Sequence, residues 1–254
     1  EKTRGFLKYV CFSDDLFIMN KKWLEEFTRL YKAHIGIPFM CQIRPEFIDE
    51  DVLANLKESG CDKVVFGIET GNEDLRTKIL NKRIKNDEFI KMAQLVKKYR
   101  MKIHTFNMFG IPTETLENSF ETIMLNVKIK ADMVASSMFM PFPGTELTEL
   151  AIKAGCLAST YSFKDIPQSF HRKSILKTPV IDKQEKIHKI IFIACKYPIL
   201  IPFIKRIIQI DNIFIKHVIS PMFFFLFLLS YLFRFKGCRN SFFGILRFIY
   251  RFRN

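Results

Sequence analysis

The chain has 254 residues, 48% of them hydrophobic, which is enough for one large domain with a packed core or for a domain with an appendage. Its net charge of +14 is unevenly placed, because residues 161–254 contain 17 Lys/Arg and 4 Asp/Glu, whereas residues 1–160 contain 23 and 22. Any electrostatic attraction to nucleic acid or to an anionic membrane is therefore expected from the C-terminal part. The first 160 residues are nearly neutral, which excludes such an attraction for them.

Short apolar runs alternate with longer amphipathic stretches over the first 156 residues. Residues 64–68 are apolar as in a buried strand, whereas 86–100 carry apolar residues at helical spacing. In chain order we expect a strand at 6–12, a helix at 21–34, a strand at 37–43, a helix at 49–60, a strand at 63–68, helices at 73–80 and 86–100, a strand at 102–110, a helix at 113–129 whose capping box starts at Thr113, a strand at 133–142 and a helix at 146–156.

This alternation predicts parallel strands with right-handed crossovers, in either a doubly wound sheet or a barrel. No G-x-G-x-x-G sequence and no P-loop follows a strand, which disfavours a nucleotide-binding doubly wound sheet. Polar residues do follow several strands, and the strand ends of a barrel share one mouth. These are Ser13, Asp14 and Asp15, Gln42 and Arg44, Glu69, Asn107, and residues 141–145. Five strands cannot close an eight-stranded barrel, so we expect either an open barrel or the remnant of one.

Glu69 is the most conspicuous of these polar residues, because it ends the apolar run 64–68. A carboxylate at this point can accept two hydrogen bonds from a vicinal diol such as a ribose. Gly67 and Gly71 would let a ligand approach the backbone closely. The alternative is a glutamate at a helix N-terminus, which the helix dipole favours. The sequence alone leaves both interpretations open.

The other polar candidates carry weaker signals. Asp14 and Asp15 could bind a cation or an ammonium group, or they could begin the helix near Asn20. Arg44 suits a carboxylate ligand, although a surface arginine is the more common case. The prolines and glycines of 109–115 and 141–147 predict rigid strand-to-helix turns.

The sequence offers no metal-ligating pattern. The six cysteines lie at least 20 positions apart, so no C-x-x-C zinc motif is present. We interpret them as structural thiols in a reducing compartment. His104 and His171 have no partner at metal-ligand spacing, so neither is expected to be a ligand.

Four stretches in this order resemble the radical S-adenosylmethionine (radical SAM) enzymes: FSDDLF, CQIRPEFIDEDVLANLKESGCDKVVFGIETGNEDL, NMFGIPTETLE and PFPGTEL. They are most similar to the subgroup whose members often carry an N-terminal cobalamin-binding domain, and the resemblance covers residues 6–156. It implies an α/β fold, a partial (β/α) barrel in which the five units are strands two to six, followed by an α-helical C-terminal region.

The resemblance also implies cofactor-binding roles. Glu69 would hold the ribose of S-adenosylmethionine, Asp14 or Asp15 would lie near its amino group, and Arg44 near its carboxylate. The remaining positions are Gly110, Ile111 and Pro112, which would flank the adenine, and Phe142 and Pro143, which would line the same mouth.

One departure from the family pattern is serious. The C-x3-C-x2-C loop that binds the family's [4Fe–4S] cluster is absent from this sequence, and the spacing of the six cysteines gives no substitute. We expect either a piece of a longer protein that lacks its N-terminal part, which the missing first strand unit favours, or a degenerate member. This chain alone is expected to hold no cluster and to be inactive, and any cobalamin would be bound upstream.

The intact protein is expected to cleave S-adenosylmethionine reductively at a [4Fe–4S] cluster. We expect a cobalamin-dependent methyltransferase or oxidative cyclase that acts on a small or lipid-like apolar substrate and takes electrons from a donor. A non-catalytic, membrane-associated binding protein on a degenerate barrel is the alternative. An ordinary phosphate-binding barrel enzyme is less favoured, because no glycine-rich phosphate loop is recognisable.

The C-terminal part differs in composition from the core. We expect residues 1–160 to form the incomplete barrel and residues 161–254 a basic, aromatic-rich helical region. The run 218–233 has 16 residues without a charge, and a helix of that length spans about 24 Å, less than a ~30 Å hydrocarbon core. We expect a cytoplasmic protein whose C-terminal region lies on the inner face of the membrane. A helical cap on the barrel is the alternative, and nucleic-acid binding is disfavoured by the high apolar content.

Overall fold

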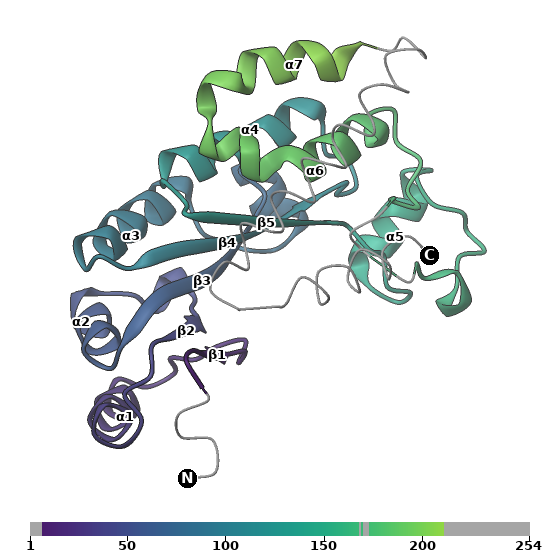
Figure 1. Ribbon diagram of the computed structural model, residues 1–254. Helices are drawn as coiled ribbons and strands as arrows, with labels where there is room; N and C mark the ends of the chain where they lie inside the picture. The colour runs from purple at the N-terminus through teal and green to yellow at the C-terminus, as the bar shows by residue number, and fades with distance from the viewer. Residues whose placement is uncertain (1–6, 168, 170–172, 211–254) are drawn as a thin grey trace.

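The computed structural model describes residues 7–167, 169 and 173–210 (Figure 1). Strands and helices follow one another as β1 (Val10–Phe12), α1 (Lys21–His34), β2 (Phe39–Gln42), α2 (Glu50–Glu58), β3 (Cys61–Glu69), α3 (Asn86–Lys98), β4 (Lys102–Phe109), α4 (Leu116–Lys128), β5 (Met133–Met138), α5 (Glu146–Lys153), α6 (Ile181–Lys196) and α7 (Ile201–Gln209). A π-helical turn covers Leu75–Ile79, and 3₁₀ turns cover Pro45–Phe47, Phe163–Asp165 and Pro198–Leu200. Each strand and helix expected from the sequence is present, the segment 73–80 as the π-helical turn.

The five strands form one parallel sheet in the sequential order β1-β2-β3-β4-β5. Crossovers of one hand between successive neighbours place the connecting helices on one face of a sheet. Figure 1 shows α1, α2, α3 and α4 along the same side of the curved sheet. A doubly wound sheet would reverse its strand order and carry helices on both faces. The fold is therefore the expected α/β partial barrel.

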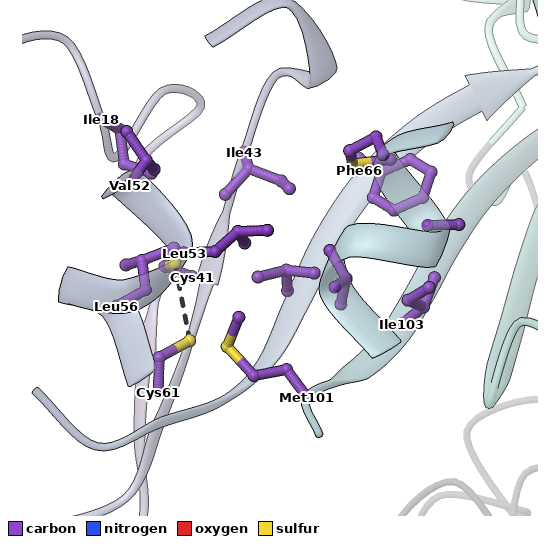
Figure 2. Close-up of a cluster of buried hydrophobic side chains, with 14 of the residues drawn as sticks. Ile18, Cys41, Ile43, Val52, Leu53, Leu56, Cys61, Phe66, Met101 and Ile103 are labelled. Carbon is purple, nitrogen blue, oxygen red and sulfur yellow. Dashed lines mark hydrogen bonds between the residues drawn. The ribbon is translucent and has the colours of Figure 1, made fainter. Parts of the chain in front are cut away.

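The main core lies between the sheet and these helices. Phe66 of β3 and Ile103 of β4 are at most 2% exposed and belong to the same buried cluster as Leu53 and Leu56 of α2. Figure 2 shows these side chains between the helices and the strands. Fully burying an apolar side chain of this size contributes about 1.5–3 kcal/mol, so this layer fixes the strands that carry the edge residues.

Two predicted boundaries differ from the structure. Only Val10, Cys11 and Phe12 of the first predicted strand pair with β2. The predicted helix 113–129 begins at Leu116, and its capping box starts at Thr115 rather than Thr113. The prediction of Thr113 was wrong because that residue has a φ of +72°, a left-handed conformation that does not begin a helix.

The chain continues after α5 into two helices on the outside of the barrel. Figure 1 shows α6 beside α4 and β5, with α7 farther out. Ile187, Ile190 and Ile191 of α6 share a buried cluster with Phe109 and Phe120. Residues 181–209 therefore confirm the expected α-helical region.

The structure bears on the C-terminal part only as far as residue 210. Within 7–167, 169 and 173–210, no helix combines the length and apolar character that crossing a bilayer requires. The apolar run 218–233, like His171 and Cys238, lies outside the described residues.

Candidate functional site

All nine candidate residues lie where the parallel strands end, at one edge of the sheet. Asp14 and Asp15 follow β1, Arg44 follows β2, Glu69 ends β3, Gly110, Ile111 and Pro112 follow β4, and Phe142 and Pro143 follow β5. Their exposure differs: the turn 110–112 is buried and Glu69 half-buried, whereas the two aspartates and Arg44 are exposed and Phe142 is 51% exposed. The edge thus combines a rigid centre with exposed charged groups.

The loop after β1 leaves both aspartates in solvent. Asn20 is the N-cap of α1 and accepts from the backbone N–H of Lys22 at 2.9 Å, so neither Asp14 nor Asp15 begins this helix. The Gln42 amide donates to the Ser13 carbonyl at 3.5 Å, which joins the loop to β2. Both carboxylates are therefore exposed at this edge of the sheet.

Arg44 is held loosely beside the end of β2. Its guanidinium lies 3.3 Å from the Glu46 carboxylate and 5.9 Å from the centre of the Phe47 ring. The Arg44 side chain is 54% exposed, so this pair is screened by water and contributes little to stability. A ligand carboxylate could replace Glu46 at small cost.

Glu69 is held in an uncommon conformation at the end of β3. Its φ is +64°, and the pairing of β3 with β4 shifts register between Gly67 and Glu69. Such bulges redirect a side chain at the end of a strand. The Glu69 carboxylate lies 3.3 Å from Nζ of Lys82, which also donates to the Gly67 carbonyl at 2.6 Å. Glu69 thus combines a left-handed backbone conformation with an ion pair to Lys82.

The two glycines beside Glu69 have a different role from the one expected. A Cβ at Gly67 would lie 2.0 Å from Oε1 of Glu69, and a Cβ at Gly71 would lie 2.3 Å from the Glu121 carbonyl oxygen of α4. The backbone N–H of Gly71 donates to Oγ1 of Thr122 at 2.8 Å. Protein atoms therefore occupy the space beside both glycines, the Glu69 carboxylate at Gly67 and the α4 backbone at Gly71.

Arg76 was missed by the sequence analysis. Its side chain is fully buried and donates to the Thr70 carbonyl at 2.6 Å, the Ile84 carbonyl at 2.9 Å and Oδ1 of Asn86 at 2.7 Å. It also lies 5.0 Å from the Phe89 ring centre. Burial lowers the pKa of Arg76 from its ordinary value. Because Thr70 follows Glu69 directly, Arg76 fixes the backbone that carries the carboxylate.

The sequence held one signal for a buried Arg76. Leu75, Ile79 and Leu80 place their apolar side chains on one helical face, and position 76 shares that face with 79 and 80. A charged residue on an apolar face must find internal partners.

The turn after β4 is held by the buried carboxylate of Glu114. Oε2 accepts from the backbone N–H of Gly110 at 2.7 Å and of Ile111 at 3.1 Å, and Oε1 accepts from the Ser119 hydroxyl at 2.8 Å. Gly110 has a φ of +74°, and a Cβ there would lie 3.0 Å from Cδ1 of Ile181. The segment predicted to flank an adenine is therefore rigid.

Glu114 should make stability depend on pH. Burial raises the pKa of this carboxyl from 4.5 to about 7, against the opposing effect of its three donors. The preference of the folded protein for the protonated Glu114 carboxyl contributes stability that is fully present below the pKa of the unfolded state. This contribution is lost as pH rises through the folded-state pKa of about 7. Because this shift corresponds to roughly 3 kcal/mol, Glu114→Gln should flatten the fall in unfolding free energy between pH 5 and pH 8.

Chemical denaturation of both proteins across this pH range measures the effect. Glu117→Gln is the control, because Glu117 is exposed in the first turn of α4. An equal fall in the Glu114→Gln variant and in the wild type would contradict the assignment.

The alternation of β4 places Asn107 away from the mouth. Its Nδ2 donates to the Ala135 carbonyl at 2.9 Å and its Oδ1 accepts from Asn126 of α4 at 2.8 Å. The prediction that Asn107 joins the polar cluster was wrong because successive strand residues point to opposite faces. Phe106 faces the other way and is 42% exposed.

Phe106 is uncovered because its neighbours on the sheet are small. Gly67 and Ala135 stand beside it in register on β3 and β5. Side chains in register on parallel strands share a face, so neither neighbour covers the ring. The face opposite the helices thus presents an aromatic ring near the edge that carries Glu69.

The described residues do not fit a [4Fe–4S] cluster. No three His, Cys, Asp or Glu side chains within them are grouped as a metal site would require. Cys41 and Cys61 contact each other at 4.0 Å, but they lie in the core shown in Figure 2. The hydrogen bond with Cys61 and burial raise the pKa of the Cys41 thiol, whereas a metal ligand must be a thiolate.

Comparison with known sequences gives related enzymes over part of their length. An uncharacterized methyltransferase of Pyrococcus horikoshii is 30% identical over 147 residues, which cover 58% of this chain and 32% of the relative. The tRNA-2-methylthio-N(6)-dimethylallyladenosine synthase of a Sulfurihydrogenibium species is 27% identical over 135 residues, which cover 49% of this chain and 30% of that protein. The chain thus spans about a third of the length of these relatives.

Two solved structures are similar at low identity. The radical S-adenosylmethionine methyltransferase TsrM from Kitasatospora setae has a TM-score of 0.46 at 19% identity, covering 54% of this chain and 28% of its own. Coproporphyrinogen III oxidase from Escherichia coli has a TM-score of 0.49 at 13% identity, covering 72% of this chain and 37% of its own.

The sequence profile of the radical SAM superfamily matches residues 2–125. The match includes β1 to β4 with Asp14, Asp15, Arg44, Glu69 and the turn 110–112. Residues 2–125 of the chain belong to the radical SAM superfamily.

Proposed function

We propose that the edge of the sheet binds S-adenosylmethionine and that the intact protein is a methyltransferase. The observation that carries this proposal is the position of Glu69 at the end of a buried strand. Its backbone is in the left-handed conformation, and its carboxylate lies 3.3 Å from Nζ of Lys82. Residues 1–160 would form the cofactor-binding core.

Each edge residue suits one part of this cofactor. The two oxygens of Glu69 can accept hydrogen bonds from the two ribose hydroxyls. Arg44 would exchange Glu46 for the methionine carboxylate, and Asp14 or Asp15 would receive the ammonium group. The buried turn Gly110–Pro112 would form a fixed wall for the adenine, and Phe142 with Pro143 would cover the ligand from β5.

The chemistry of such a site comes from the bound cofactor. S-adenosylmethionine supplies the methyl group or the hydrogen-abstracting radical of the family's reactions. Within the described residues, no three His, Cys, Asp or Glu side chains are grouped to hold the cluster. The part played by this chain is to bind and orient S-adenosylmethionine; cobalamin and an electron donor would be supplied from elsewhere.

An apolar substrate is the best match to the face beside the edge. Phe106 is 42% exposed there, and Met108 and Met40 stand on the same face. A methyltransferase is preferred to an oxidative cyclase because a relative at 30% identity is called a methyltransferase. The alternative of a non-catalytic binding protein is not favoured by similarity to enzymes.

Calorimetric titration of the 254-residue chain with S-adenosylmethionine tests this proposal. We expect binding by the wild type and an affinity at least about tenfold lower for Glu69→Ala, because a hydrogen bond to a charged acceptor contributes about 1.5–3 kcal/mol. Glu58→Ala is the matched control, since Glu58 is also paired with a lysine, at 3.0 Å, but precedes β3 at the opposite edge. Absence of binding, or equal binding by Glu69→Ala, would refute the proposal.

A further inference from the structure

The junction between α6 and α7 exposes several large apolar side chains. This elbow comprises Lys196 to Phe203 and contains the 3₁₀ turn Pro198–Leu200. Ile199 is 87% exposed, Phe203 62%, Tyr197 51% and Leu200 39%. Single exposed apolar residues are ordinary, but four of them fall within seven positions, and such a concentration is typical of an interaction surface.

The exposed apolar residues of the elbow are separate from the residues that pack α7 against the protein. Ile201, Ile204 and Ile208 form the buried side of α7. Phe203 lies on the opposite side of the same helix, so no shift of α7 could bury it together with these isoleucines. The elbow therefore has an apolar surface of its own beside the face that holds α7 to the protein.

Basic residues accompany this apolar surface. Lys196 Nζ lies 5.8 Å from the Phe192 ring centre and 5.7 Å from that of Tyr197, and Lys205 Nζ lies 4.7 Å from that of Phe120. The ammonium group of Lys196 thus lies beside Tyr197 of the elbow, whereas that of Lys205 lies over the buried Phe120 of α4. Arg206 is exposed and follows Phe203 by three residues, so these two side chains share a face of α7. Residues 186–210 contain five Lys/Arg and no Asp/Glu.

We propose that the elbow docks on an anionic phospholipid surface. Tyr197, Ile199, Leu200 and Phe203 enter the boundary between headgroups and acyl chains, and Lys196 and Arg206 meet the lipid phosphates. Apolar groups inside a basic rim are the pattern of interfacial membrane segments. The 44 residues after Ile210 contain one acid and seven Lys/Arg, so they offer this basic rim no complementary charge.

Docking through the elbow leaves the cofactor edge accessible. α6 begins at Ile181, whose side chain approaches Gly110 at that edge. The elbow begins at the other end of this 16-residue helix, about 24 Å away along its axis. The proposal is independent of S-adenosylmethionine binding and can be tested without it.

Sedimentation of the full chain with lipid vesicles tests the docking. We expect binding to vesicles of phosphatidylcholine and phosphatidylglycerol in equal parts and much weaker binding to phosphatidylcholine alone. Ile199→Ser/Phe203→Ser should lower the partition coefficient at least about tenfold, because each side chain loses an apolar burial. Lys196→Gln/Arg206→Gln should lower binding to the anionic vesicles alone.

The matched control is Phe163→Ser/Lys164→Gln, which removes a 72% exposed phenylalanine and its neighbouring lysine from another surface and should bind as the wild type does. A tryptophan introduced by Phe203→Trp in a Trp23→Phe background should shift its emission to shorter wavelength on anionic vesicles and be quenched by brominated acyl chains. Three results would overturn the proposal: wild-type vesicle binding by the serine variant, a tryptophan already shielded without vesicles, or self-association in sedimentation velocity that the serine variant abolishes.

Discussion

Arg76→Met is expected to lower the unfolding free energy by about 3 kcal/mol, because methionine leaves the Thr70 and Ile84 carbonyls and the Asn86 side chain without their buried donor. For a chain of this size the thermal midpoint should fall by about 6–12 °C. The volume of the side chain is nearly kept, so the loss reports the hydrogen bonds rather than a cavity. Thermal unfolding followed by circular dichroism measures it.

Two further variants separate the causes of this loss. Arg76→Lys keeps the charge, but a single ammonium group cannot reach all three acceptors that the planar guanidinium reaches. It should therefore restore less than half of the lost stability. Arg83→Met removes an exposed arginine from the same segment and should change stability by less than about 0.5 kcal/mol. A stability of Arg76→Met equal to that of Arg83→Met would contradict the role given to the buried guanidinium.

Gly71→Ala should destabilise the protein by about 2–4 kcal/mol. The new Cβ would lie 2.3 Å from a backbone oxygen of α4, which cannot move as a flexible side chain would. Moving α4 away from Gly71 would also stretch the hydrogen bond that the Gly71 N–H donates to Oγ1 of Thr122. Urea denaturation compares the variant with the wild type, and affinity for S-adenosylmethionine should fall with it because Glu69 is two residues away.

Gly155→Ala is the control for backbone strain. Gly155 has a φ of +68° and no atom within 4 Å of its Cβ position, so alanine there costs only the left-handed conformation, about 1–2 kcal/mol. A Gly71→Ala variant no less stable than Gly155→Ala would show that the contact with α4 is not tight.

The order of strands and helices could be predicted because each depends on local patterning. The run 63–68 and the spacing of 86–100 specify their own structure, and alternation of the two implies parallel pairing. The end of each strand could likewise be placed, which brought Glu69 and the turn 110–112 to one edge.

The details of the edge depended on contacts that the local pattern of a single strand or helix does not show. The requirement for glycine at position 71 comes from the backbone of α4, some fifty residues later. The buried side chain of Arg76 donates to the Ile84 carbonyl and to the Asn86 side chain. Asn107 was assigned to the wrong face because its polarity outweighed its place in the alternation. A polar residue within a strand can satisfy a buried partner as well as a ligand.

The central claim is that Glu69 binds the ribose of S-adenosylmethionine, and a ligand that lacks the two hydroxyls tests it most directly. The wild-type chain should bind S-adenosylmethionine at least about tenfold more tightly than its 2′,3′-dideoxy analogue, whereas Glu69→Ala should bind both with nearly equal, low affinity. If Glu69→Ala keeps the full preference for the natural ribose, the carboxylate does not bind the diol and the account of this edge is wrong.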